Sequence, residues 1–95
     1  MGDGMYVGAL VLIKGIVQGV GYRFYVSRAA ASLDLYGSVC NLVNGSVEVK
    51  VEGRRSAIQE LIKQLAIGPR FSKVTSVQVN WLPYTGAYKK FSIVP

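Results

Sequence analysis

The pattern of apolar and polar residues predicts a strand and two helices in the earlier part of the chain. Residues 6–14 are rich in aliphatic and β-branched side chains and end at Gly15, which is typical of a central strand. After a glycine-rich segment, residues 22–33 carry apolar side chains at helical spacing, so we expect a helix there. A second helix with an apolar stripe begins after Ser56, which can cap it, and stops at Gly68-Pro69.

The dipeptide Asn44-Gly45 lies between two β-prone runs and favours a two-residue type I′ hairpin turn, because both central positions of that turn need positive φ. In this register Asn41 faces Glu48, and Cys40 faces Val49. Cys40 then lies on the apolar face of the hairpin, whereas Asn41 lies on the polar face toward water. The register therefore predicts a buried Cys40 and an Asn41 on the uncovered side of the sheet.

Two more alternating segments complete the predicted fold. Residues 77–81 alternate apolar and polar side chains, and Phe91 with Ile93 indicates a short strand at the end. The order β-α-β-β-α-β with a short final strand predicts an α+β, ferredoxin-like sandwich, in which two helices cover one face of an antiparallel sheet. We expect one domain over residues 1–95, with a flexible N-terminus at residues 1–5.

Composition narrows the chemistry that this chain can perform. The 95 residues are 51% hydrophobic, enough for one core, and their net charge of +6 attracts anions: phosphorylated metabolites, nucleic acid or an anionic membrane. The absence of His and the single cysteine, Cys40, exclude histidine-dependent bases and nucleophiles, thiolate metal clusters and internal disulfides. An enzyme of this composition works by positioning and charge. One unpaired cysteine favours a cytoplasmic location, and the apolar stretch 5–13 is too short to span a membrane.

A six-residue segment between the first strand and the first helix is the candidate anion-binding loop. It consists of Gln18, Gly19, Val20, Gly21, Tyr22 and Arg23. Its glycines allow a sharp turn with N–H groups pointing outward, the helix N-terminus adds a positive dipole end, and Arg23 adds a planar charged fork. Phosphate is the guest that such a loop favours. The first two strands of a split βαβ unit run parallel, so Asn41, near the end of the second strand, lies at the same edge of the sheet as this loop. The sequence does not fix the distance between Asn41 and the loop.

The motif Gly15-x-Val-Gln-Gly-Val-x-Tyr-Arg23, followed by Gly37-x-Val-x-Asn41 and Asn44-Gly45-Ser-Val47, closely resembles the acylphosphatases. The resemblance extends to Phe91-Ser92-Ile93 and so covers nearly the whole chain. It implies a hydrolase, without metal or cofactor, that cleaves the carboxyl-phosphate bond of acyl phosphates to a carboxylate and inorganic phosphate. By this resemblance, Arg23 and the N–H groups of residues 19–23 hold the phosphoryl oxygens, and Asn41 orients the attacking water.

The chain departs from the pattern of these proteins at four positions. Ile16 replaces an arginine, Tyr22 a phenylalanine, Asp34 a helix-ending glycine and Asn44 a turn aspartate. Tyr22 must place its hydroxyl, and Asp34 at positive φ costs on the order of 1 kcal/mol against glycine. These departures bear on stability more than on chemistry.

Two other classes of protein share the predicted element order. RNA-recognition domains have the same topology, but they stack bases on aromatic residues of the third strand, and residues 46–52 contain none. A protein-binding or regulatory module of the same fold stays open as an alternative, since fold and loop do not prove turnover. We therefore expect an acyl phosphate as substrate and inorganic phosphate or a similar anion in the loop. Nucleic acid is disfavoured as a partner, and no membrane is expected.

Overall fold

A computed structural model describes residues 5–95 of the chain. The expected flexible N-terminus at residues 1–5 lies outside the described residues, apart from Met5. The helices and strands are β1 (Tyr6–Ile16), α1 (Tyr22–Ser32), β2 (Tyr36–Asn41), β3 (Val47–Arg54), α2 (Arg55–Ile67), β4 (Lys73–Pro83) and β5 (Phe91–Ile93). This order matches the one that the sequence predicts.

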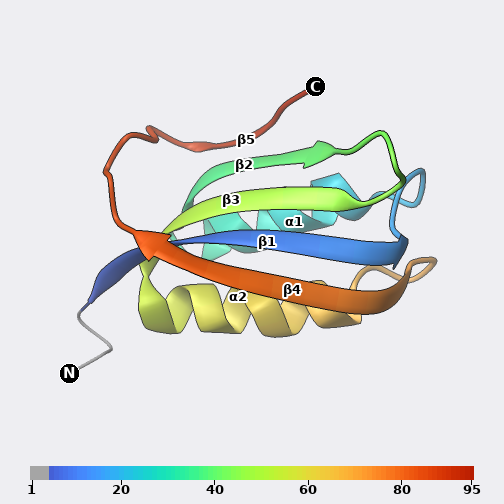
Figure 1. Ribbon diagram of the computed structural model, residues 1–95, viewed down its shortest axis with the longest axis horizontal. Coiled ribbons are helices and arrows are strands. Elements are labelled where there is room, and N and C mark those ends of the chain that lie inside the picture. The colour runs from blue at the N-terminus through green and yellow to red at the C-terminus, as the bar shows by residue number, and fades with distance from the viewer. Residues whose placement is uncertain (1–4) are drawn as a thin grey trace.

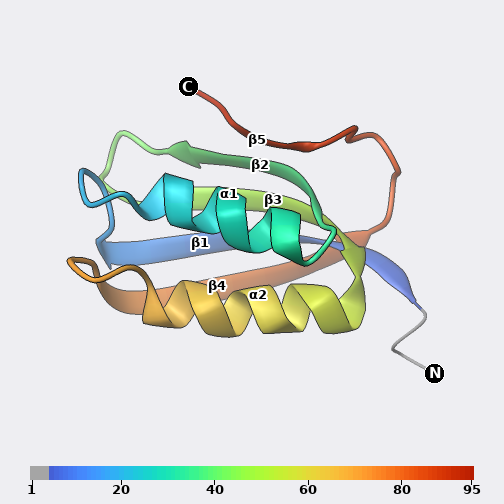
Figure 2. The same ribbon diagram turned by 180° about the vertical axis from the view of Figure 1, so that it is seen from behind.

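The five strands form one sheet in the order β4-β1-β3-β2-β5, with both helices on one face (Figures 1 and 2). This arrangement confirms the ferredoxin-like α+β sandwich with a short final strand. The neighbours among β1 to β4 are antiparallel, as predicted, whereas β5 runs parallel to β2 and makes the sheet mixed. The reason is geometric. β4 stops at the end of the sheet where β2 begins, and a strand that starts there and lies beside β2 must run in the same direction as β2.

The core lies between the sheet and the two helices. Its side chains with 0% exposure come from β1, β2 and β3 and from one face of each helix: Val11, Ile13, Val39, Val47, Val49, Val26, Ala30, Ile58, Leu61 and Leu65. The predicted apolar stripes of both helices are therefore confirmed. Among the described residues, neither helix is long and apolar enough to cross a membrane.

The predicted helix ends are partly wrong. α2 begins at Arg55, one residue before the expected cap Ser56, and no described side chain caps it. β3 runs directly into the helix, and the Arg55 N–H donates to the main-chain carbonyl of Met5 at 2.9 Å. The stop at Gly68 is as predicted. Asp34 adopts a φ of 55°, so the expected backbone strain at this position is present.

The turn between β2 and β3 is a three-residue loop, and the predicted two-residue type I′ turn is wrong. The Leu42 N–H donates to Ser46 O at 2.8 Å, and the Gly45 N–H donates to Leu42 O at 3.1 Å. Gly45 has a φ of 94°, whereas Asn44 does not take positive φ. The Asn44 side chain instead accepts a hydrogen bond from the Ser46 N–H at 3.0 Å, which stabilises the longer turn.

The longer turn shifts the hairpin register by one residue and exchanges the faces of Cys40 and Asn41. Cys40 pairs with Glu48 and not with Val49, and its Sγ lies 3.9 Å from Glu48 Oε1 on the open sheet face. Asn41 pairs with Val47, whose side chain is fully buried. Asn41 therefore lies on the helix-covered face, the opposite of the prediction.

Candidate active site

The loop from β1 to α1 is an open cradle of main-chain N–H groups. Gly19 and Gly21 have φ values of 73° and 77°, which L-residues adopt rarely, and a Cβ on either glycine would meet nothing within 4 Å. Backbone conformation, not crowding, thus favours glycine here. Gly21 is the N-cap of α1, and no described side chain caps this helix. Its first-turn N–H groups are therefore available to an anion or to water.

Gln18 holds the loop against the β2–β3 turn. Its side-chain Nε2 donates to the carbonyls of Leu42 at 2.8 Å and Ser46 at 2.9 Å. Leu42 directly follows Asn41, so this pair of hydrogen bonds brings the end of β2 beside the loop. Figure 1 shows the β1–α1 loop and the β2–β3 turn at the same end of the sheet. The side chain of Gln18 thus binds main-chain carbonyls of the β2–β3 turn and anchors the loop to that turn.

Tyr22 contributes its main chain to the loop and its side chain to the core. The side chain is only 1% exposed, and its hydroxyl donates to the Leu65 carbonyl at 2.7 Å. Burial, together with the neighbouring Tyr25, raises the pKa of Tyr22 far above its usual range. The hydroxyl group by which Tyr22 differs from the expected phenylalanine is therefore satisfied by one hydrogen bond to α2.

Arg23 is the charged residue of the cradle. It lies in the first turn of α1, is half-buried, and lines a hollow of about 180 Å³ together with Gly19, Gly21 and Phe24. Its guanidinium makes no hydrogen bond or ion pair with any residue in the described range 5–95. The fork of Arg23 is therefore free to bind an anion.

Asn41 carries an unpaired polar atom one residue before Leu42, which Gln18 of the loop contacts, but it is not among the residues that line the hollow of Arg23. Its Oδ1 is buried, yet it accepts no hydrogen bond from the described part of the chain. A buried amide oxygen without a donor costs about 1–3 kcal/mol, so this atom favours an added donor such as water. The register shift accounts for its position, because it turns Asn41 toward the side of the sheet that carries α1.

The sequence does not predict that β5 borders this site. Ile93 pairs with Val39 on β2 and lines the hollow that contains Arg23. The Val94 N–H donates to the Val39 carbonyl at 3.0 Å, which fixes the strand there. The alternation of Phe91 and Ile93 predicts the strand, but no local signal shows which edge of the sheet it joins.

The fold and the loop together define a small ferredoxin-like α+β protein with an anion-accepting cradle at a strand-to-helix junction. The acylphosphatase family model matches residues 9–93. The chain belongs to the acylphosphatase family, and it is an enzyme that hydrolyses acyl phosphates. The resemblance seen in the sequence motifs is thereby confirmed.

Relatives and a solved structure of this family match the chain over most of its length. The acylphosphatase of Caldanaerobacter subterraneus subsp. tengcongensis is 47% identical over 85% of this chain and 90% of its own. That of Caldivirga maquilingensis is 47% identical over 90% of this chain and 87% of its own. The crystal structure of acylphosphatase from Bacillus subtilis is 35% identical and superposes with a TM-score of 0.91, covering 96% of this chain and all of that one.

Proposed function

We propose that this enzyme binds the phosphoryl group of its substrate in the loop of residues 18–23 and activates water at Asn41. Arg23 is the charged ligand of the phosphoryl oxygens. The observation that carries the proposal is the buried, unpaired Oδ1 of Asn41 beside a cradle whose arginine is also unpaired. Both groups then gain partners when the phosphoryl group and the water are bound.

The cradle matches a phosphoryl group in shape and charge. The left-handed conformations at Gly19 and Gly21 turn main-chain N–H groups outward, and the N-terminus of α1 adds its positive dipole end. Arg23 supplies two parallel donors to two phosphoryl oxygens. Inorganic phosphate, a product of the reaction, fits the same cradle.

The reaction needs placement and charge more than a covalent partner. The Oδ1 of Asn41 accepts a hydrogen bond from a water molecule and directs its oxygen lone pair at phosphorus. The bond from phosphorus to the acyl oxygen breaks, its electron pair leaves on the carboxylate, and the water loses a proton to solvent as phosphate forms. Arg23 and the loop N–H groups stabilise the charge on the phosphoryl oxygens in the transition state.

We propose that the reaction uses no metal or cofactor. The chain has no histidine, and in residues 5–95 no three His, Cys, Asp or Glu side chains gather where they could hold a metal ion. An unpaired guanidinium already supplies the positive charge that a metal would give.

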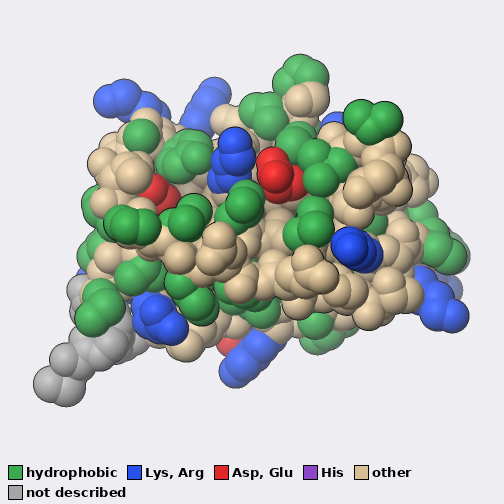
Figure 3. All heavy atoms as spheres, viewed as in Figure 1, with side chains coloured by type: hydrophobic (Ala, Val, Ile, Leu, Met, Phe, Trp, Pro, Cys, Tyr) green, Lys and Arg blue, Asp and Glu red, His purple; other side chains and the backbone are tan. Residues whose placement is uncertain are grey.

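We propose that the enzyme does not bind nucleic acid. On the face away from the helices β3 carries Glu48, Lys50 and the buried Glu52, none of which can stack on a base. Figure 3 shows Lys and Arg side chains scattered over this face among hydrophobic and acidic ones, without a continuous basic stripe.

We also propose a cytoplasmic location, which the free thiol of Cys40 supports. We propose a single domain, which the family match over residues 9–93 supports.

Titration of the ¹⁵N-labelled protein with inorganic phosphate tests the cradle directly. The amide signals of residues 19–23 should shift most, and the side-chain signal of Arg23 should shift with them. The amides of the remote turn at Gly86 provide the internal reference. Shifts that are no larger in the loop than at Gly86 would contradict the proposal.

A further inference from the structure

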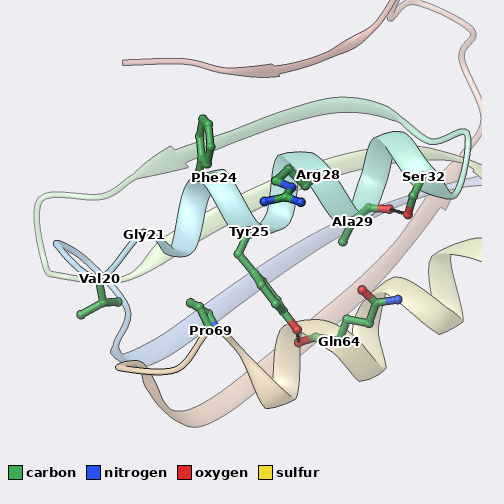
Figure 4. A pocket seen from close by; sticks show the side chains of 9 residues that line it. All are labelled: Val20, Gly21, Phe24, Tyr25, Arg28, Ala29, Ser32, Gln64 and Pro69. Carbon is green, nitrogen blue, oxygen red and sulfur yellow. Dashed lines mark hydrogen bonds between the residues drawn. The ribbon is translucent and has the colours of Figure 1, made fainter.

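A second depression lies between the two helices. This groove of about 660 Å³ is bordered by α1 and α2 (Figure 4). Tyr25 crosses it from α1 to α2, where its hydroxyl donates to the main-chain carbonyl of Gln64 at 2.8 Å. This hydrogen bond joins the two helices and so fixes their positions on either side of the groove.

The groove lies next to the hollow that contains Arg23. Gly21 and Phe24 line both depressions, and Val20 of the loop lines the groove. A phosphoryl group held by the loop therefore has the groove directly beside it. Whatever is attached to that phosphoryl group can lie along α1 in the groove.

The lining of the groove has an apolar part and one free charge. The apolar part comes from Val20, the ring of Tyr25, Ala29 and Pro69, whereas Phe24, which is 67% exposed, directs its ring away from α2 (Figure 4). Arg28 is exposed, makes no ion pair within residues 5–95, and meets no acidic residue in the groove. Arg28 lies six residues, or about 9 Å, along α1 from Tyr22, and its side chain leans toward the helix N-terminus.

We propose that the groove binds the acyl part of the substrate, and that Arg28 favours acyl groups that end in a second anionic group. This inference rests on the proposed role of residues 18–23 in phosphoryl binding. The substrate class is an acyl phosphate with an apolar body, about as long as one aromatic ring, between two anionic ends. α1 contacts both β2, which carries Asn41, and α2, which borders the groove.

Two substrates that differ only in the distal charge test the role of Arg28. Benzoyl phosphate and 4-carboxybenzoyl phosphate share the same ring and the same reacting bond. We expect the native enzyme to show a higher kcat/KM for the carboxylated substrate, and Arg28→Gln to lower that preference about 1.5-fold to fivefold, the size of an exposed ion pair. The preference of the native enzyme should also fall as salt is added.

Lys50→Gln is the matched control, because it removes the same charge from an exposed position on the opposite face of the sheet. It should leave the preference unchanged. A preference that Arg28→Gln does not lower, or that Lys50→Gln lowers equally, would overturn the inference. Circular dichroism of each variant verifies that α1 is intact.

Arg23→Ala separates this inference from the proposed function. If it abolishes turnover of both substrates while Arg28→Gln leaves the preference unchanged, the groove assignment alone fails. If a folded Arg23→Ala variant hydrolyses both substrates normally, the phosphoryl-binding loop itself is assigned wrongly, and the inference fails with it.

Discussion

The side chain of Gln18 donates to the carbonyl of Leu42 at 2.8 Å and thereby joins the β1–α1 loop to the end of β2. A second hydrogen bond from the same nitrogen reaches Ser46 at 2.9 Å. These contacts span 24 and 28 residues of sequence. They position the cradle relative to Asn41, so the geometry of the proposed site depends on an amide that need not touch the substrate.

Gln18→Glu tests this coupling. A carboxylate cannot donate to the two carbonyls, so we expect a loss of about 1–3 kcal/mol in the free energy of unfolding and a lower kcat. Urea unfolding and steady-state hydrolysis measure the two effects. Gln78→Glu, at an exposed position of β4, is the control and should change little. Unaltered activity and stability of Gln18→Glu would show that the coupling has no consequence.

Arg23→Lys tests the need for a planar fork. Lysine keeps the charge but loses the two parallel donors, so most activity should be lost, and Arg23→Ala should be worse. By analogy with the deletion of one oxyanion donor, the loss is about 2.7–4 kcal/mol of transition-state stabilisation. The measurement is kcat/KM on benzoyl phosphate, with the exposed Arg70→Lys as control. Near-normal turnover by a folded Arg23→Ala variant would refute the assignment.

Asn41→Ala should separate water activation from phosphate binding. We expect turnover to be abolished while competitive inhibition by inorganic phosphate stays nearly unchanged, because Arg23 and the loop N–H groups remain. Arg23→Ala should instead lose phosphate inhibition. Removal of the unpaired buried oxygen should also leave the free energy of unfolding unchanged or raise it. Equal loss of phosphate inhibition in both variants would make Asn41 a phosphate ligand.

Chelation tests the absence of a metal from the mechanism. Exhaustive treatment with a chelator should leave kcat/KM unchanged, since His is absent from the sequence. For the same reason no enzyme group should titrate near the histidine range at about pH 6.5, and an inflection there should follow the substrate or product phosphate. Restoration of a chelated, inactive enzyme by a divalent ion would contradict this expectation.

Tyr22→Phe should destabilise the protein without changing its chemistry. The variant leaves the buried Leu65 carbonyl without its donor at 2.7 Å, which costs about 1–3 kcal/mol. Tyr36→Phe removes an exposed hydroxyl and should be neutral. Thermal and urea unfolding provide the comparison, and equal stability of the two variants would show that the Tyr22 hydroxyl contributes nothing.

The same substitution should alter stability at high pH. Burial raises the pKa of Tyr22, and to a lesser degree that of Tyr25, in the folded protein. A tyrosine in the unfolded chain ionises near a pH of about 10, so the contribution of Tyr22 is fully present below that pH and is lost as the pH rises above it. Tyr22→Phe should therefore show a flatter decline of stability above this pH than the native chain.

The local pattern of the sequence determined most of the elements and the residues offered for chemistry. The apolar stripes of α1 and α2 and the glycines before Arg23 are local features, and each is found where periodicity and turn chemistry predict it. The motif around Arg23 and Asn41 also indicated the family correctly. These features are readable because they depend on neighbours within a few residues.

Only the tertiary structure decided which way Asn41 faces and what surrounds Arg23. Asn44-Gly45 is compatible with either a two-residue or a three-residue turn, and a one-residue slip moves every side chain of the strand to the other face of the sheet. The placement of Ile93 beside the hollow of Arg23 requires β5 to cross to the far edge, which is a long-range pairing. Such choices follow from packing across the whole sheet, because no short segment contains both partners.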